Sequence, residues 1–441
     1  MSVNANLGLV FFPAFDWAIS PTHPERQERL LYTRDQIVEE GLLDLPQIRE
    51  YKPKLATIAD AERVHIGVPD LSSLLTDAHL VSAGGALAAA EAVMAKQVRR
   101  SFALVRPPGH HAMRIVHGTR GFCTINIEAV MVEYLRQTYG IRRIAIVDTD
   151  VHHGDGTQDI FYHDPDTLFI SFHQDGRTLY PGTGFMDEMG SPNAFVSTVN
   201  IPLPPGTGDQ GLHYVLDNLI LPMVADFEPE LIINSAGQDN HYSDPLANMA
   251  ITAQGYAKLA DKLGADIAVL EGGYSIEDAL PYVNTGIILA MAGLDYSKVL
   301  EPDKGRHVPQ QTEQTTAYIK KLVDDWRRIW AVRSEMRRHE IAKTGDMWRR
   351  KRSIYYDDSG IREQQQEEVR LCPLCQGYQT VGTQAEGAGF GYKSAYAAVI
   401  PRHACPACRR QAQEAVVAAR RTGQYQFYFL QDKEKDLLEK V

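Results

Sequence analysis

The sequence predicts an α/β fold in which an open, mostly parallel sheet forms the middle of three layers and helices cover both of its faces. Short apolar segments alternate with helical patterns over the first three hundred residues, and this alternation is typical of parallel sheets that are buried on both sides. Nearly every apolar segment is followed at once by a polar or glycine-rich turn. Because ligands bind beyond the carboxyl ends of the strands in open α/β sheets, we expect these turns to meet around one site.

The predicted strands are short and strongly apolar, as expected for the central strands of a buried sheet. They cover residues 102–105 (FALV), 144–147 (IAIV), 168–172 (LFISF), 231–233 and 267–270 (IAVL). Helical patterns lie between or beside them at residues 78–97, 126–139, 209–226 and 252–263. The turns that follow the strands read RPPGHH, DTDVHHGDG, HQDG, NSAGQDNH and EGGY. The histidines and carboxylates of these turns are the candidates for a reaction centre.

Length and composition limit the classes of protein to consider. A chain of 441 residues exceeds the roughly 100–200 residues of one domain, so we expect more than one module. The hydrophobic fraction of 44% allows a large core, and the net charge of −11 argues against nucleic-acid binding by the whole surface. We find no run of about 18 apolar residues that would predict a membrane span. The first twenty residues lack the basic segment of a signal peptide, so we expect a cytoplasmic protein.

The segment 148–157 (DTDVHHGDGT) holds the densest group of potential metal ligands. Asp150 and His152 are two positions apart directly after a strand, so both side chains can point the same way. Catalytic zinc usually takes three protein ligands and keeps one position open. Asp239, which follows the strand 231–233, is the natural third ligand. A polar turn with capping carboxylates is the alternative for an isolated Asp-x-His motif, but this segment is too rich in ligands to favour it.

Two adjacent histidines, His110 and His111, follow another predicted strand. Beside a metal-bound water, two imidazoles can serve as general base and general acid, and Asp148 and Asp155 are available to fix their tautomers and orientation. In the turn EGGY, two glycines let the backbone approach the site, where the Tyr274 hydroxyl can donate to the oxyanion of a tetrahedral intermediate. A structural histidine pair and a packing tyrosine are the alternatives when each motif is taken alone.

The C-terminal third of the chain has a different character. Residues 306–370 are polar and charged, and we expect a helical connector there. Residues 411–441 predict a charged helical tail. The basic run 349–352 (RRKR) indicates a solvated helix face or, together with the cysteine-containing module that follows it, a contact for nucleic acid or an acidic partner.

Residues 371–410 contain two CPxC pairs, which predict a closed structural zinc site in a small zinc-ribbon-like module. A redox pair is the alternative. The 29 residues between the pairs exceed the roughly 15–20 of an ordinary ribbon, so a longer hairpin or an insertion is needed. The four predicted ligands are Cys372, Cys375, Cys405 and Cys408.

Six motifs in order make the first 300 residues resemble the histone deacetylase and acetylpolyamine amidohydrolase family, nearest to its class II and bacterial members. The motifs are RPPGHHA (106–112), GFC (121–123), DTDVHHGDGTQ (148–158), YPGTG (180–184), SAGQDNHYSDPL (235–246) and EGGY (271–274). The resemblance implies an arginase-like or deacetylase-like fold and a zinc-dependent deacetylase domain over residues 1–305. The implied substrate is an acylated amine, either an acetyl-lysine protein or peptide or a small acetylated amine.

The resemblance also implies roles for individual residues. Asp150, His152 and Asp239 hold the zinc, Asp148 stands behind His110, and Asp155 stands behind His111. Gly121, Phe122, Tyr180 and Leu246 contact the substrate, with tyrosine at 180 where the family usually has phenylalanine. Leucine at 246 replaces a glutamate of polyamine-selective relatives, which argues against polyamine substrates. A potassium ion is implied beside the zinc, held by Asp148, Asp150, His152, Ser171 and Phe172.

Two other functions are alternatives to a one-metal deacetylase. A two-metal, arginase-like hydrolase would need a carboxylate at position 154, where this chain has glycine. A catalytically inactive binding module would lack a zinc ligand, a tandem histidine or the tyrosine, and the sequence retains all of them. An acetylpolyamine or small-metabolite deacetylase is the alternative within the family, and a homo-oligomer is compatible with the sequence. The loop 112–120 is two residues longer than in the family, and we expect it to add His117 and two arginines to the pocket entrance.

Overall fold

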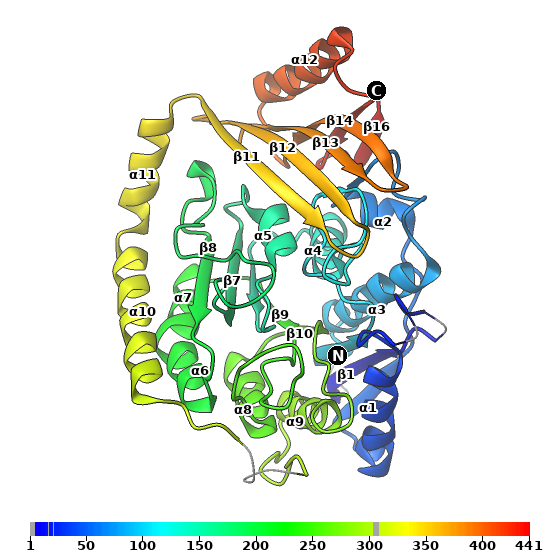
Figure 1. Ribbon diagram of the computed structural model, residues 1–441, viewed down its shortest axis with the longest axis vertical. Helices are drawn as coiled ribbons and strands as arrows, with labels where there is room; N and C mark the ends of the chain where they lie inside the picture. The colour runs from blue at the N-terminus through cyan, green and yellow to red at the C-terminus, as the bar shows by residue number, and fades with distance from the viewer. Residues whose placement is uncertain (1–4, 16, 21, 303–307) are drawn as a thin grey trace.

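The protein is described here by a computed structural model that covers residues 5–15, 17–20, 22–302 and 308–441 (Figure 1). The expected boundary between residues 305 and 306 lies outside these ranges. An eight-stranded sheet in the order β2-β1-β4-β10-β9-β6-β7-β8 forms the centre of the larger unit, and every neighbouring pair is parallel. The strands are β1 (Ala5–Phe12), β2 (Ile48–Tyr51), β4 (Val98–Val105), β6 (Ile144–Asp148), β7 (Thr167–Gln174), β8 (Thr198–Leu203), β9 (Leu231–Ala236) and β10 (Ile267–Leu270).

The helices lie on both faces of this sheet, so the predicted three-layer fold is confirmed. Alternate residues of each strand point to opposite cores: Phe102 joins one and Ala103 the other. One face carries α1 (Glu28–Glu39), α6 (Asp209–Val215), the π-helical turn η3 (Leu216–Ile220), α7 (Leu221–Phe227), α8 (Ala253–Leu263) and α9 (Leu280–Ala292). The other face carries α3 (Asp77–Met94), α4 (Ile127–Tyr139) and α5 (Asp155–Phe161).

The carboxyl ends of the central strands meet at one edge of the sheet. In the pairing register, Asp148 at the end of β6 stands between Ser171 of β7 and Ser235 of β9. The segments that follow these strands therefore start side by side, although they are far apart in the sequence. This arrangement brings the predicted ligands together.

Short elements complete the larger unit. A second, two-stranded parallel sheet pairs Ile66 with Ile115. Its strands are β3 (Ile66–Gly67) and β5 (Ile115–Val116), and the remaining short helices are α2 (Ile58–Glu62), η1 (Leu42–Asp44) and η2 (Pro192–Ala194). Among the residues that the structure describes, no helix is long and apolar enough to cross a membrane.

The predicted connector is helical only in its first part. Helix α10 (Glu313–Ala331) packs on the larger unit through the fully buried Trp326, whose indole N–H donates to the Asn200 carbonyl at 2.8 Å. Helix α11 (Arg333–Thr344) follows, with all of its residues at least partly exposed. From Met347 to Arg370 the prediction of helix is wrong, because the chain forms the antiparallel strands β11 (Met347–Tyr356) and β12 (Ile361–Arg370).

The physical reason for this error is a polar buried face. Residues of β12 alternate between buried and exposed, as strand residues should, but three of the buried ones are Glu363, Gln365 and Glu367. They are paired with polar groups: Glu367 accepts from the guanidinium of Arg350 at 2.7 Å. A search for alternating apolar residues does not detect such a strand. Arg350 is thus directed at a carboxylate of its own module rather than belonging to a solvated helix face.

The cysteine-containing region and the tail belong to the same sheet as β11 and β12. The order is β11-β12-β13-β14-β15-β16, so the chain from Met347 onward forms one unit, the C-terminal module (Figure 1). The prediction of a helical tail over 411–441 is wrong beyond Thr422, because the chain returns to the sheet through the buried strand β15. The elements are β13 (Gln379–Gly387), β14 (Gly391–Ile400), α12 (Pro406–Thr422), β15 (Phe427–Asp432) and β16 (Leu437–Lys440).

The C-terminal sheet packs between α12 and the larger unit. One apolar cluster joins Val381 and Phe429 of the C-terminal sheet to Ile66 and Ile115 of the small parallel sheet. A second cluster places Ala412 of α12 against other residues of β14 and β15. The C-terminal module is therefore built onto the larger unit through a continuous interface, which makes contacts with the active-site loops possible.

Candidate metal centre and active site

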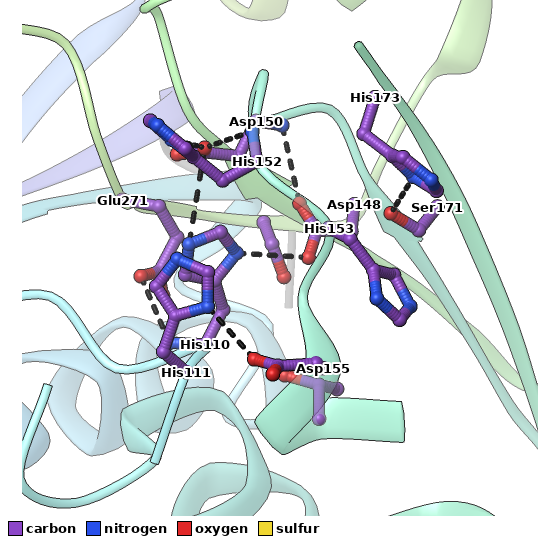
Figure 2. A network of polar contacts seen from close by, with 12 residues as sticks. His110, His111, Asp148, Asp150, His152, His153, Asp155, Ser171, His173 and Glu271 are labelled. Atoms are coloured by element: carbon purple, nitrogen blue, oxygen red, sulfur yellow. Dashed lines mark hydrogen bonds and ion pairs between the residues drawn. The ribbon is translucent and has the colours of Figure 1, made fainter. Parts of the chain in front are cut away.

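Three predicted ligands come together at the carboxyl ends of β6 and β9. One ligand atom from each of Asp150, His152 and Asp239 lies within 4.8 Å of the other two. His152 Nδ1 is 3.0 Å from Asp150 Oδ1 and 3.1 Å from Asp239 Oδ2, as Figure 2 shows for the first of these contacts. Both carboxylates are fully buried. The prediction that residues following two separate strands converge is confirmed.

This donor set fits a divalent metal. Two buried carboxylates and one imidazole direct their donor atoms at the same point, which is costly for the carboxylates without a cation. Burial and the charge of Asp150 accordingly raise the pKa of the Asp239 carboxyl. Glycine 272 leaves the room that the group needs, because a Cβ there would lie 2.2 Å from Asp239 Oδ2 and 2.6 Å from Asp150 Oδ2.

The tandem histidines stand beside the ligands, each backed by its own carboxylate (Figure 2). His110 Nδ1 lies 3.1 Å from Asp148 Oδ2, and His111 Nδ1 lies 2.8 Å from Asp155 Oδ1. The two rings are 4.1 Å apart, and the His111 ring is 5.9 Å from the ring of His152. In each imidazole, a carboxylate engages Nδ1, so Nε2 is left available for another partner.

The pKa values of the two histidines are shifted in opposite directions. Burial, and after it the charge of His110, lower the pKa of His111 to about 3. Burial alone would lower the pKa of His110 as well, but the carboxylates of Asp150 and Asp148 overcome it and raise that pKa to about 10. Groups whose pKa values are pushed apart are typical of acid and base partners at one site.

The turn that carries Tyr274 packs against Phe122 of the GFC motif. Tyr274 is buried, and burial raises the pKa of its phenol well above the usual value, so the hydroxyl keeps its proton. Its backbone N–H donates to Asp244 Oδ2 at 2.7 Å, which anchors the turn. The ring lies 5.6 Å from the ring of Phe122, and the Arg29 guanidinium carbon is 4.8 Å from the ring centroid.

The predicted channel residues flank this group. The Tyr180 ring is 5.1 Å from the ring of His111. A Cβ at Gly121 would lie 2.4 Å from His111 Cδ2, so only glycine permits this approach, and its φ of +52° also favours glycine. Phe122 follows with a φ of +68°, an uncommon value for a side chain of this size. Leu246 is half-buried, and its N–H donates to Asp244 at 2.9 Å.

Three of the residues predicted to hold potassium, Asp148, Ser171 and Phe172, lie on the adjacent strands β6 and β7. Asp148 of β6 is the register partner of Ser171 on β7, and Phe172 follows it. Ser171 Oγ is 2.9 Å from Nδ1 of His173 (Figure 2). The structure brings these residues together with Asp148, whereas the identity of any ion there stays a prediction.

The longer loop 112–120 does not line the entrance as expected. Arg114, His117 and Arg120 are all buried, and the prediction that they add charge to the mouth is wrong. His117 Nε2 lies 3.0 Å from the Thr383 hydroxyl of the C-terminal sheet. Arg120 instead forms an ion pair with Asp155 at 2.6 Å, and it holds the pKa of that carboxyl below its usual range although burial acts in the opposite direction.

The four cysteines form a second candidate metal site, away from the first. One sulfur from each lies within 4.8 Å of the others, and the Sγ atoms of Cys372 and Cys405 are 4.0 Å apart. Backbone N–H groups of Leu374 and Gly377 donate to sulfur atoms of the first pair. The β13–β14 hairpin occupies the sequence between the pairs, which is the longer hairpin that the 29-residue spacing requires.

Several supporting residues were not predicted from the sequence. Glu271 accepts from the N–H groups of Gly109 and His110 at 2.8 and 3.1 Å, and its place in the EGGY motif was the available signal. Asp357 and Asp358, in the β11–β12 turn, accept from the channel loop. No signal in the local sequence marks those two carboxylates, because they act on residues 236 positions away.

Known proteins are similar to this chain in sequence and in fold. The histone deacetylase domain family matches residues 70–291. A probable deacetylase of Archaeoglobus fulgidus is 44% identical over 341 residues, which cover 70% of this chain and 93% of that protein. A histone deacetylase-like amidohydrolase of Pseudomonas aeruginosa is 34% identical over 223 residues, and the match covers 48% of this chain and 58% of that protein. The crystal structure of the HDA15 HD domain is similar with a TM-score of 0.64 at 26% identity, covering 77% of this chain and 98% of that one.

The chain therefore belongs to the histone deacetylase family, as the six ordered motifs predicted. Its relatives carry the names deacetylase and amidohydrolase, and the family places the protein among the hydrolases that act on amide bonds.

Proposed function

We propose that the protein is a zinc-dependent amidohydrolase that removes an acetyl or another short acyl group from an N-acylated amine such as acetyl-lysine. The observation that carries the proposal is the meeting of Asp150, His152 and Asp239 beside the tandem histidines. Zinc held by these three side chains would act as a Lewis acid on the acyl carbonyl and would lower the pKa of a water. The four cysteines would hold a second, structural zinc.

His111 is the general base of this proposal. Its Nδ1 is engaged by Asp155 at 2.8 Å, which leaves Nε2 to take the proton of the attacking water. Its lowered pKa keeps the imidazole neutral at pH 7, as a base must be. Arg120 holds Asp155 ionised, so the carboxylate can stabilise the imidazolium that forms.

Tyr274 stabilises the tetrahedral intermediate. Its protonated hydroxyl donates to the oxyanion that develops on the acyl carbonyl oxygen. Imidazolium at His111 then returns its proton to the amine nitrogen as the C–N bond breaks, which yields a free amine and a carboxylic acid; the acid then loses its proton to water. His110, whose Nδ1 lies 3.1 Å from Asp148 Oδ2, stands beside His111 as the second imidazole of the site.

Gly121, Phe122, Tyr180 and Leu246 bind the substrate stem in this proposal. The aromatic rings of Phe122 and Tyr180, beside Tyr274 and His111, suit contact with an unbranched alkyl chain. Potassium held by Asp148, Asp150, His152, Ser171 and Phe172 would offset the buried carboxylates behind the zinc.

The structure weakens the two-metal alternative further. A Cβ at Gly154 would lie 2.0 Å from Asp148 Oδ2, so this backbone has no room for the carboxylate that a second ion would need.

Substrate profiling on the zinc-loaded protein tests the proposal. We expect turnover of a fluorogenic acetyl-lysine peptide that is lost on chelation and restored by zinc. Acetylpolyamines and small acetylated metabolites, assayed in parallel, distinguish the alternative substrates within the family. A protein with its full zinc content that hydrolyses none of these amides would contradict the proposal.

A further inference from the structure

The turn between β11 and β12 reaches from the C-terminal module into the active-site loops. Asp357 Oδ1 accepts two hydrogen bonds at 3.1 Å, one from the Gly121 N–H and one from the Tyr180 hydroxyl. Asp358 Oδ2 accepts from the Phe122 N–H at 2.7 Å. One carboxylate therefore joins two separate walls of the channel, and its neighbour holds the next residue of one wall.

Further hydrogen bonds join the same loop to neighbouring residues of β11 and the turn. The Ser359 hydroxyl accepts from the Thr119 N–H at 2.8 Å, and the Tyr355 carbonyl accepts from Arg120 Nε at 3.1 Å. Tyr356 donates from its hydroxyl to the Ile115 carbonyl at 2.7 Å. Five consecutive residues, from Tyr355 at the end of β11 to Ser359 in the turn, thus bond the segment from Ile115 to Phe122, which overlaps the loop 112–120.

The backbone that the turn holds is uncommon. Gly121 and Phe122 both have positive φ, at +52° and +68°, and their consecutive N–H groups point at the two carboxylates. Successive N–H groups of this kind form a concave anion-binding arrangement. A phenylalanine in the left-handed backbone conformation persists only where surrounding contacts stabilise it. Since Phe122 also contacts the Tyr274 ring, this conformation bears directly on the shape of the channel.

The Tyr180 hydroxyl is the second group that this turn holds. It donates to Asp357 Oδ1 of the C-terminal module at 3.1 Å. The Tyr180 side chain and the β11–β12 turn are therefore the two halves of one contact.

We propose that Asp357 and Asp358 are positioning residues of the active site, so that the C-terminal module forms part of the substrate channel. They hold the Gly121–Phe122 wall and the Tyr180 wall at the separation that the acyl-amine stem requires. This inference rests on the proposed function for the identity of the bound substrate. The contacts of Asp357 and Asp358 do not depend on it.

Kinetics of an alanine and an asparagine variant test the inference. We expect Asp357→Ala to raise KM for an acetyl-lysine peptide about ten-fold, with kcat reduced less than three-fold, since a wall shifts while the reacting groups stay. Asp357→Asn keeps an oxygen acceptor and should restore KM to within about three-fold of the unaltered value. The matched control is Asp346→Ala, an exposed carboxylate just before β11, which should leave KM unchanged.

A coupling measurement separates positioning from general destabilisation. In a Tyr180→Phe background, Asp357→Ala should raise KM by clearly less than in the unaltered protein, because one of its two contacts is already gone. Equal effects in both backgrounds, or a KM within two-fold of the unaltered value for both Asp357→Ala and Asp358→Ala, would overturn the inference. If an alanine variant does not fold, Tyr180→Phe decides in its place, since it removes the hydroxyl that donates to Asp357. We expect it to raise KM more than two-fold, and a KM within two-fold of the unaltered value would overturn the inference.

Hydrogen exchange supplies a readout that needs no turnover. The Gly121 and Phe122 amides should exchange at least about ten-fold faster in Asp357→Ala and Asp358→Ala, respectively, and at unaltered rates in Asp346→Ala. Unaltered exchange in all three variants would contradict the contacts. Changed exchange in a protein that hydrolyses no acylated amine would contradict the proposed function instead, and the two failures are therefore distinguishable.

Discussion

Replacing Tyr274 by phenylalanine removes one hydroxyl and little else. The ring contacts with Phe122 and with the Arg29 guanidinium involve the aromatic face and edge, and the phenylalanine retains them. Asp244 holds the turn through the backbone N–H, which the substitution does not touch. The effect should therefore fall on the oxyanion. Loss of one donor to such an oxyanion typically costs about 10²–10³ in kcat, or roughly 3–4 kcal/mol.

The assay is steady-state hydrolysis of a fluorogenic acetyl-lysine peptide, with the zinc content measured on the same sample. We expect kcat to fall at least about 10²-fold while zinc binding and KM change little. Tyr428→Phe, in the C-terminal sheet, is the matched control for loss of a tyrosine hydroxyl. A Tyr274→Phe protein with kcat within three-fold of the unaltered enzyme would refute the role of this hydroxyl.

Three further changes test other parts of the account. Gly272→Ala places a Cβ 2.2 Å from Asp239 Oδ2, and we expect it to lower the zinc content from two ions per chain to one and to abolish turnover; two retained ions would contradict the fit. Cys372→Ser should also lower the content to one ion, but the remaining ion should be the catalytic one, whereas loss of both together would argue against independent sites. His65 is buried between the Met113 carbonyl and the Asn126 N–H, and burial lowers its pKa to about 4. Since the unfolded chain takes up this proton near pH 6.5 and the folded chain only near 4, stability should fall by about 2 kcal/mol from pH 7 to pH 5 through this group. Denaturant unfolding of His65→Gln should show that much less pH dependence, and an unchanged dependence would count against the assignment.

The sequence predicts the catalytic unit well because its signals are local. Strands such as Ile144–Asp148 are apolar up to their last residue and are followed directly by functional residues. The rule that ligands collect at carboxyl ends of parallel strands then suffices to bring Asp150 and Asp239 together. Helix boundaries agree with the prediction to within a few residues, for example at 253–263 against the predicted 252–263.

The fold of the C-terminal module could not be predicted in this way, because it depends on contacts between residues that are far apart in the sequence. Strand β12 buries Glu363 and Glu367 on its inner face, so its alternation is invisible to a count of apolar residues. The arginines that satisfy Glu367 read as a basic patch when their partners are unknown. Asp357 gives no local hint of its contact with Gly121 and Tyr180, since only the folded interface brings those loops together.

In the proposed active site, one metal ion joins Asp150, His152 and Asp239 next to the tandem histidines. Anomalous diffraction from a crystal of the purified protein, recorded on both sides of the zinc absorption edge, tests for this ion. We predict one peak among these three side chains and a second among the four cysteine sulfurs. A first site without a peak in zinc-replete, active protein, or a peak ligated by other residues, would contradict the account.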